Sequence, residues 1–275
     1  MINSKTKLCC VIGNPIEQSI SPLVHNAAYK ALGLNYVFLA FKVTQVKEAL
    51  EGLKAMNVTG ISVTIPHKLE VLKYVDEVDK VAAEIGAANT IVNKEGRFIA
   101  TNTDWIGALK ALEKKTSLSG KRIALLGAGG AARALIYGLV KRGAKVTVFN
   151  RTKVKAHQLA KYFQLEGTYL LSDIEKIKKA EIIINTTSVG MIPNISESPI
   201  PNECINSSQI IFDIINKPYE TKLLQYAKIR GATIIHGYEM LLYGAAEQFQ
   251  LFTGKAAPVK IMENAILQNL VHKYA

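Results

Sequence analysis

The chain has 275 residues, of which 49% are hydrophobic and 20% charged, as is typical of a globular protein long enough for two domains. Its net charge of +12 would suit nucleic-acid binding, but the basic residues are scattered and form no run interleaved with aromatics, so we expect no nucleic-acid partner. Charge interrupts the apolar segments before they reach membrane-spanning length and no signal peptide is visible, so we expect no membrane partner either.

The three cysteines are Cys9, Cys10 and Cys204, an odd number without metal-ligand spacing. The first two lie in a predicted buried strand, where thiols act as small apolar residues. We therefore expect a reducing compartment, the cytoplasm, and no metal site.

Strands and helices alternate along the first hundred residues. Ser21 followed by Pro22 predicts an N-cap and the first position of a helix. Hydrophobic periodicity predicts strands over 8–12, 36–41, 60–65, 91–93 and 98–100, and helices over 22–32, 46–56 and, as short amphipathic pieces, 69–85.

Polar residues stand where these strands end. Ser19 and Ser21 lie at the mouth of a strand-to-helix turn, where capping would explain Ser21 but not Ser19. His67 and Lys68 follow the third strand directly, at the carboxyl end where open α/β sheets bind ligands, although a lysine there is more often an ordinary surface residue. Asp104 opens a helix, and it is either an N-cap or a functional carboxylate.

The segment 121–151 predicts a strand, a glycine turn, a helix and a second strand, the size of one mononucleotide-binding half. Gly127 permits the tight turn, Gly129 lets backbone N–H groups approach a pyrophosphate, and Ala132 lets helix and strand pack closely. The helix N-terminus adds free donors and partial positive charge. Tight packing alone would also favour Gly and Ala, but the flanking strands favour dinucleotide binding.

The second strand of this unit ends at Asn150-Arg151-Thr152, where an NAD-binding unit usually has Asp or Glu. A carboxylate would repel a 2′-phosphate, whereas an arginine can bind a 2′-phosphate with two charge-assisted hydrogen bonds. The alternative is that Arg151 merely caps a solvated helix start. We predict NADP rather than NAD.

The alternation continues to the end of the chain. The change of pattern near Asp104 predicts a domain boundary. Further helices are predicted over 153–163, 219–230, 239–253 and 258–272, and further strands over 182–185, 210–215 and 233–235.

Eight short segments, in order and spread over almost the whole chain, resemble the shikimate dehydrogenase family. Any one alone would be weak, but eight in the family's order are highly specific. The segments are Ser19-Ile-Ser-Pro22, Val63-Thr-Ile-Pro-His-Lys68, Gly86-Ala-Ala-Asn-Thr90, Asn102-Thr-Asp104, Gly127-Ala-Gly-Gly-Ala-Ala132, Asn150-Arg-Thr152, Asn185-Thr-Thr-Ser-Val-Gly-Met191 and Gly237-Tyr-Glu-Met-Leu241.

The resemblance implies an α/β fold of two domains separated by a cleft. Residues 1–104 with 238–275 would form the N-terminal substrate-binding and catalytic domain, and 105–237 a Rossmann-type NADP-binding domain with a mostly parallel sheet. The implied reaction is the reversible NADPH-dependent reduction of 3-dehydroshikimate to shikimate, in the biosynthesis of chorismate and aromatic amino acids. A monomer and a homodimer are both compatible with the sequence.

The resemblance also implies roles for particular residues. Lys68 and Asp104 would assist hydride transfer, since a lysine stabilises charge on the reacting oxygen and supplies its proton. The residues implied to bind substrate are Ser19 and Ser21 at the carboxylate, and Thr64, Lys68, Asn89 and Asp104 at the ring oxygens. The residues implied to bind NADP(H) are Gly127, Ala128, Gly129, Gly130, Ala131 and Ala132 at the pyrophosphate, Asn150, Arg151, Thr152 and Lys155 at the 2′-phosphate, and Ile214 and Gly237 near the nicotinamide.

The chain departs from the family pattern at the implied substrate site. Ser62 replaces the usual Asn, Asn216 the usual Tyr and Gly244 the usual Gln. These changes leave the catalytic set in place but leave open whether the substrate is shikimate, quinate or another cyclic hydroxy acid. A non-catalytic ligand-sensing relative is the alternative outside the enzyme class, although the presence of both Lys68 and Asp104 argues against it.

Overall fold

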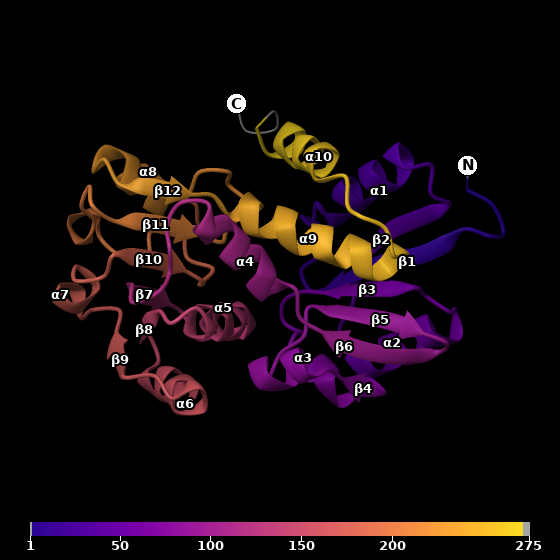
Figure 1. Ribbon diagram of the computed structural model, residues 1–275, viewed down its shortest axis with the longest axis horizontal. Coiled ribbons are helices and arrows are strands. Elements are labelled where there is room, and N and C mark those ends of the chain that lie inside the picture. Colours follow the sequence, from indigo (N-terminus) through magenta and orange to yellow (C-terminus); the bar gives the residue numbers. More distant parts are fainter. Residues whose placement is uncertain (1, 272–275) are drawn as a thin grey trace. The chain divides into compact units, whose positions relative to one another are not determined.

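The computed structural model describes residues 2–271, which fall into two compact α/β units (Figure 1). Of the described residues, the first unit contains 2–104 and 242–271, and the second is Trp105–Leu241. The predicted two-domain α/β fold is confirmed. No helix in the described part of the chain combines the length and the hydropathy that crossing a bilayer requires.

The first unit is built on a mixed six-stranded sheet in the order β2-β1-β3-β5-β6-β4. Strand β1 pairs in parallel with β2 and β3, β5 runs antiparallel to both β3 and β6, and β4 is parallel to β6. The strands are β1 (Lys7–Gly13), β2 (Tyr36–Lys42), β3 (Gly60–Val63), β4 (Glu77–Val78), β5 (Thr90–Lys94) and β6 (Arg97–Thr101).

Helices cover both faces of this sheet. One face packs apolar residues of α2 and α3, such as Leu50 and Ala82, into the core. On the other face α1 and α9 meet over aromatic side chains, with His25 stacked on Phe38 at 4.3 Å between ring centroids. The helical segments are α1 (Ser21–Ala31), α2 (Val46–Ala55), a 3-10 turn (Glu70–Lys73), α3 (Lys80–Ile85), α9 (Gly237–Thr253) and α10 (Val259–Val271).

Three predictions for the first unit need correction. Ser21 is not the N-cap of α1, because the helix already includes it and the cap residue is Ile20, which has no polar side chain. The third strand ends at Val63 instead of residue 65, and the short parallel strand β4 occupies part of the segment predicted as helical. The last helix was predicted to reach residue 272, which lies outside the described residues.

The second unit has a six-stranded, all-parallel sheet in the order β12-β11-β10-β7-β8-β9. This is the strand order of the dinucleotide-binding fold, and the order reverses between β7 and β10. The strands are β7 (Arg122–Leu126), β8 (Lys145–Asn150), β9 (Gly167–Leu170), β10 (Ile182–Asn185), β11 (Ile210–Asp213) and β12 (Thr233–Ile235).

Two apolar layers cover this parallel sheet. One is formed with α4, α5 and α6, and the other with α7, α8 and a 3-10 turn. The sequence did not predict β9 or α7, and the helix predicted from residue 219 begins at residue 222 after the Thr221 cap. The helical segments are α4 (Asp104–Glu113), α5 (Gly130–Lys141), α6 (Lys153–Phe163), α7 (Ile174–Ile177), the 3-10 turn (Asn202–Cys204) and α8 (Lys222–Ile229).

Candidate active site

The topology of the first sheet brings the predicted substrate residues to one edge. Strands β1 and β3 are parallel to each other and both end at this edge. Strand β5 runs antiparallel to β3 and begins there, and β6 runs antiparallel to β5 and ends there. The connections that follow or precede these strand ends therefore share that edge. They carry Ser19, Ser21, Thr64, Lys68, Asn89 and Asp104.

Lys68 and Asp104 form an ion pair at this edge, with 2.5 Å between Lys68 Nζ and Asp104 Oδ2. Their side chains are only 15% and 13% exposed. Lys68 is therefore not an ordinary surface lysine, the alternative that the sequence left open. Asp104 is the first residue of α4, yet its carboxylate bonds side chains rather than capping the helix.

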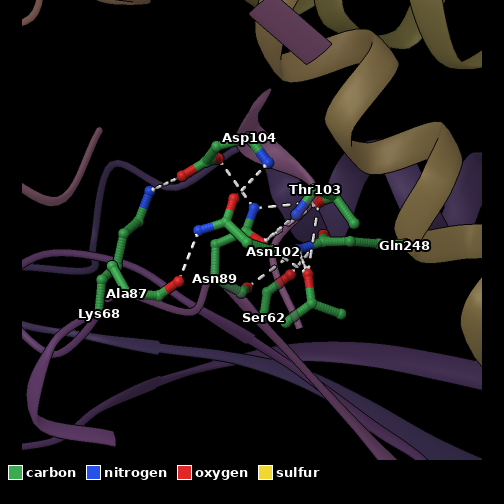
Figure 2. A network of polar contacts seen from close by, with 9 residues as sticks. Ser62, Lys68, Ala87, Asn89, Asn102, Thr103, Asp104 and Gln248 are labelled. Atoms are coloured by element: carbon green, nitrogen blue, oxygen red, sulfur yellow. Dashed lines mark hydrogen bonds and ion pairs between the residues drawn. The ribbon is translucent and has the colours of Figure 1, made fainter. Parts of the chain in front are cut away.

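Asn89 holds the other oxygen of Asp104. Its Nδ2 donates to Asp104 Oδ1 at 2.8 Å and to Thr103 Oγ1 at 3.0 Å. Its Oδ1 accepts the backbone N–H of Thr103 at 2.7 Å, and because that group can only donate, the orientation of the amide is determined. Figure 2 shows Lys68, Asp104 and Asn89 as consecutive members of one network.

The loop before Asp104 is held independently. Asn102 Nδ2 donates to the carbonyl of Ala87 at 2.9 Å, and Asn102 Oδ1 accepts the backbone N–H of Asp104 at 3.0 Å. These bonds connect the end of β6 to the turn before β5. They therefore hold the backbone at Asp104 in a defined position relative to the backbone at Asn89.

The other predicted substrate residues lie at the same edge but outside this network. Ser19 and Ser21 are partly exposed, and Ser19 Oγ accepts the backbone N–H of Ser21 at 3.4 Å. The methyl group of Thr64 lies against Gly13, where a Cβ would approach it to 2.4 Å. Within the described residues, no hydrogen bond joins these three side chains to Lys68, Asn89 or Asp104.

His67, the neighbour of Lys68, has a structural role. Its ring is buried and its Nε2 lies 2.8 Å from the carbonyl oxygen of Val43. The contact anchors the turn that carries Lys68 to the chain after β2.

Sequence analysis missed three polar residues of the network. Thr90, Thr103 and Gln248 are buried and hydrogen-bonded around Asn89. The available signal was a glutamine on the apolar face of the helix predicted over 239–253, one turn beyond Gly244.

In the second unit the glycine turn joins β7 to α5. Gly127 has φ +113°, and a Cβ there would lie 2.6 Å from Thr186 Oγ1 on the turn after β10. Packing within the protein therefore explains Gly127. Gly129, the N-cap of α5, is exposed and has no atom within 4 Å of an added Cβ, so packing does not explain it. An open helix N-terminus of this kind fits a phosphate group.

The end of β8 presents positive charge. Asn150 Nδ2 donates to the carbonyl of Thr152, which is the N-cap of α6, so Arg151 precedes the cap instead of forming it. The side chains of Arg151 and Lys155 are exposed, and neither makes an ion pair with another described residue. Two free cations beside a strand end fit a second anionic group.

Ile214 and Gly237 are brought together after β11 and β12. A Cβ on Gly237 would lie 2.5 Å from the carbonyl carbon of Ile214 and 2.3 Å from the carbonyl oxygen of Ile215. Glycine is required there because the two backbones touch. Of the described residues, no group of three or more His, Cys, Asp or Glu side chains is placed to hold a metal ion.

Family models match three stretches of the chain. They are the shikimate dehydrogenase substrate binding domain over residues 11–91, the shikimate/quinate 5-dehydrogenase over 109–222 and the shikimate 5'-dehydrogenase C-terminal domain over 237–267. The chain belongs to the shikimate dehydrogenase family. The resemblance predicted from the eight sequence segments is thus confirmed.

Relatives in this family match over almost their full lengths. The shikimate dehydrogenase (NADP(+)) of Pyrococcus furiosus is 42% identical over 97% of this chain and 97% of its own. That of Aquifex aeolicus is 44% identical over 97% and 98%.

Solved structures of the family agree with the fold. A shikimate dehydrogenase in complex with NADP+ superposes with a TM-score of 0.93 at 42% identity, covering 98% of each chain. The Thermus thermophilus enzyme in complex with NADP(H) and shikimate gives 0.89 at 33%, covering 96% of this chain and 99% of its own. A Corynebacterium glutamicum quinate dehydrogenase in complex with NAD gives 0.87 at 27%, covering 96% and 99%.

Proposed function

We propose that this protein is an NADP-dependent shikimate dehydrogenase that interconverts 3-dehydroshikimate and shikimate. The observation that carries the proposal is the Lys68–Asp104 pair, with Asn89 on the second carboxylate oxygen, in a chain of this family. A partly enclosed ammonium held by a carboxylate is suited to proton exchange with an alcohol or ketone oxygen.

Lys68 and Asp104 have the catalytic roles in this proposal. When bound, NADPH supplies the hydride for the carbonyl carbon. Lys68 Nζ stabilises the negative charge that develops on the carbonyl oxygen and gives that oxygen its proton. Asp104 keeps the ammonium oriented, and Asn89 keeps Asp104 oriented, through the bonds already described. Acid–base assistance of this kind contributes about 10²–10⁴-fold to rate.

The remaining assignments follow the family pattern. Residues 1–104 with 238–275 would bind the substrate, with Ser19 and Ser21 at its carboxylate and Thr64 at a ring hydroxyl. Residues 105–237 would bind NADP(H), with the turn 127–132 at the pyrophosphate and Arg151 at the 2′-phosphate. The two open features found there, the bare Gly129 and the unpaired Arg151, support this assignment. The three buried free thiols support a cytoplasmic location.

A steady-state assay tests the proposal. Purified protein is given shikimate or quinate with NADP+ or NAD+, and nicotinamide absorbance is followed, with Lys68→Ala as the control. We expect turnover with shikimate and NADP+ that is about 10²–10⁴-fold slower in the Lys68→Ala variant. Absence of turnover with either acid, while NADP+ still binds, would contradict a dehydrogenase and favour a ligand-sensing role.

Quinate is the second candidate substrate, and Gly244 is the observation that favours it. A Cβ at Gly244 would lie 3.7 Å from the Thr103 carbonyl, an ordinary contact, so packing does not require glycine there. Glycine inside a helix costs about 1 kcal/mol relative to alanine. The family's usual glutamine is thus replaced by a residue without a side chain beside Thr103, which would suit a substrate with an extra hydroxyl. Higher kcat/KM for quinate than for shikimate would establish this alternative.

A further inference from the structure

Gln248 on α9 uses its whole side-chain amide inside the first unit. Its Oε1 accepts from Ser62 Oγ at 2.5 Å, and its Nε2 donates to Thr90 Oγ1 at 2.9 Å and to the Asn89 carbonyl at 3.1 Å. Gln248, Ser62 and Thr90 are all buried, with exposures of 6%, 5% and 0%. A buried amide with every donor and acceptor engaged is rigid, and removing it leaves several buried groups without partners.

The donor and acceptor types determine which way each group points. A carbonyl oxygen only accepts, so the Gln248 atom facing the Asn89 carbonyl is the nitrogen. That nitrogen only donates, so Thr90 Oγ1 accepts from it and directs its own proton to Asn89 Oδ1, 2.8 Å away.

This series of directed hydrogen bonds continues as far as the proposed catalytic pair. Asn89 Oδ1 accepts the Thr90 proton in addition to the Thr103 backbone N–H. Both bonds keep the Asn89 amide nitrogen toward Asp104, whose other oxygen holds Lys68. The Asn89 backbone is held as well, because its carbonyl accepts from both Gln248 Nε2 and the Val63 N–H. Figure 2 shows the bonds running from Ser62 and Gln248 to Lys68.

We infer that Gln248, held by Ser62, is a positioning residue that orients Asn89 and, through it, the Asp104–Lys68 pair. Gln248 touches none of the proposed reacting groups itself. The inference deepens the proposed function and rests on it for its kinetic consequence.

The same contacts account for one departure from the family pattern. Ser62 stands where the family usually has asparagine, and its short side chain lets Gln248 reach β3 from α9. Gln248 lies four residues after Gly244, one helical turn along the same face. The chain therefore keeps a glutamine directed at this edge of the sheet. It lies one helical turn after position 244, where the family usually has its glutamine.

The kinetic test compares Gln248→Leu with Gln250→Leu, a matched change on the exposed side of the same helix. The measurement is the first-order rate constant of hydride transfer in a single turnover, followed by nicotinamide absorbance. A smaller folded fraction lowers the amplitude but not this rate constant. We expect Gln248→Leu to lower it roughly 10–100-fold, as misplacement of reacting groups does, and Gln250→Leu to leave it unchanged. A wild-type rate constant in Gln248→Leu would overturn the inference.

Two milder variants cover the case in which Gln248→Leu does not fold. Gln248→Glu keeps the shape but puts an acceptor where Thr90 and the Asn89 carbonyl need a donor, so we expect a loss at least as large. Ser62→Ala removes only the bond to Oε1, so we expect a smaller loss in the same direction. Rate constants equal to wild type in both variants would overturn the inference.

A measurement independent of turnover separates this inference from the proposed function. Proton exchange at the Asn89 side-chain amide is followed by ¹⁵N NMR, with Asn89→Asp identifying the signal. We expect faster exchange in Ser62→Ala and Gln248→Glu than in the wild type and Gln250→Leu. Unchanged exchange would refute the positioning role even in an active enzyme. A wild-type protein inactive on shikimate would refute the proposed function and leave this test standing.

Discussion

The two candidate sites differ in how each is held. In the first unit Lys68, Asn89 and Asp104 are enclosed, and each bonds a side chain from another segment. In the second unit Gly129 and Arg151 are exposed, and an added Cβ at Gly129 would have no atom within 4 Å. One site is thus arranged by contacts between distant segments of the chain, whereas the other is a short local motif with exposed residues.

This contrast predicts which substitutions have large effects and which have small ones. A change in the first unit disturbs a chain of partners, so its effects should be coupled and large. A change in the second unit meets few partners, so its effects should fall on one ligand group at a time.

The largest effect should come from breaking the Lys68–Asp104 pair. We expect Lys68→Ala and Asp104→Asn each to lower kcat about 10²–10⁴-fold, with unchanged NADP+ affinity. The double variant should lose little more than the worse single variant, because members of one catalytic unit are not additive. Steady-state kinetics of the three variants provide the measurement. Losses that multiply in the double variant would show that the two groups act independently.

The next effect concerns His25, which is fully buried and stacked on Phe38 in the first unit. Burial lowers its pKa to about 3 from 6.5. As the pH falls, the unfolded chain therefore takes up a proton before the folded one does, and stability present above pH 6.5 is lost between about 6.5 and 3. The loss should reach roughly 3–5 kcal/mol at the acid end.

Urea unfolding across this pH range tests the His25 prediction. His25→Phe keeps an aromatic ring and should flatten the dependence on pH. The matched variant His157→Phe changes an exposed histidine of α6 and should retain the wild-type slope. An equal slope in wild type and His25→Phe would assign the acid sensitivity to other groups.

A more selective effect is expected at Arg151. Arg151→Ala should weaken NADP+ binding about 10–100-fold, the worth of hydrogen bonds to a charged group, while NAD+ binding stays unchanged. Lys153→Ala is the control, because the family pattern assigns that neighbour no contact. Calorimetric titration with both nucleotides gives the comparison. Equal weakening for NADP+ and NAD+ would remove Arg151 from the 2′-phosphate site.

The smallest effects are expected from two glycines of one turn, Gly127 and Gly129, and should differ in kind between them. Gly127→Ala forces a side chain into φ +113° and against Thr186 Oγ1, so we expect a loss of about 1–3 kcal/mol in unfolding free energy. The Cβ that Gly129→Ala adds would have no atom within 4 Å, so the free energy of unfolding should change by less than about 0.5 kcal/mol. The same variant should nevertheless bind NADP+ more weakly. Thermal unfolding and nucleotide titration of both variants decide the matter. Normal NADP+ affinity in Gly129→Ala would contradict close approach of the pyrophosphate.

Local pattern was enough to predict much of the second unit. The helix predicted over 153–163 and the strands over 182–185 and 233–235 have those bounds in the structure. Each rests on apolar patterning, and the strand over 233–235 also on the nearby Gly231 and Gly237, signals that act over a few residues. The edge strands β4 and β9 escaped prediction because they are short and half exposed, which leaves little alternation to detect.

The family, the glycine turn and most residue types of the two candidate sites could be predicted from the sequence, because they depend on neighbours along the chain. The sequence could not predict that Lys68 bonds Asp104, that the Asn89 amide faces that carboxylate, or that Gln248 bonds Ser62 across 186 positions of sequence. Sheet register and helix packing bring such groups together, and the one-way character of each donor and acceptor then sets their direction.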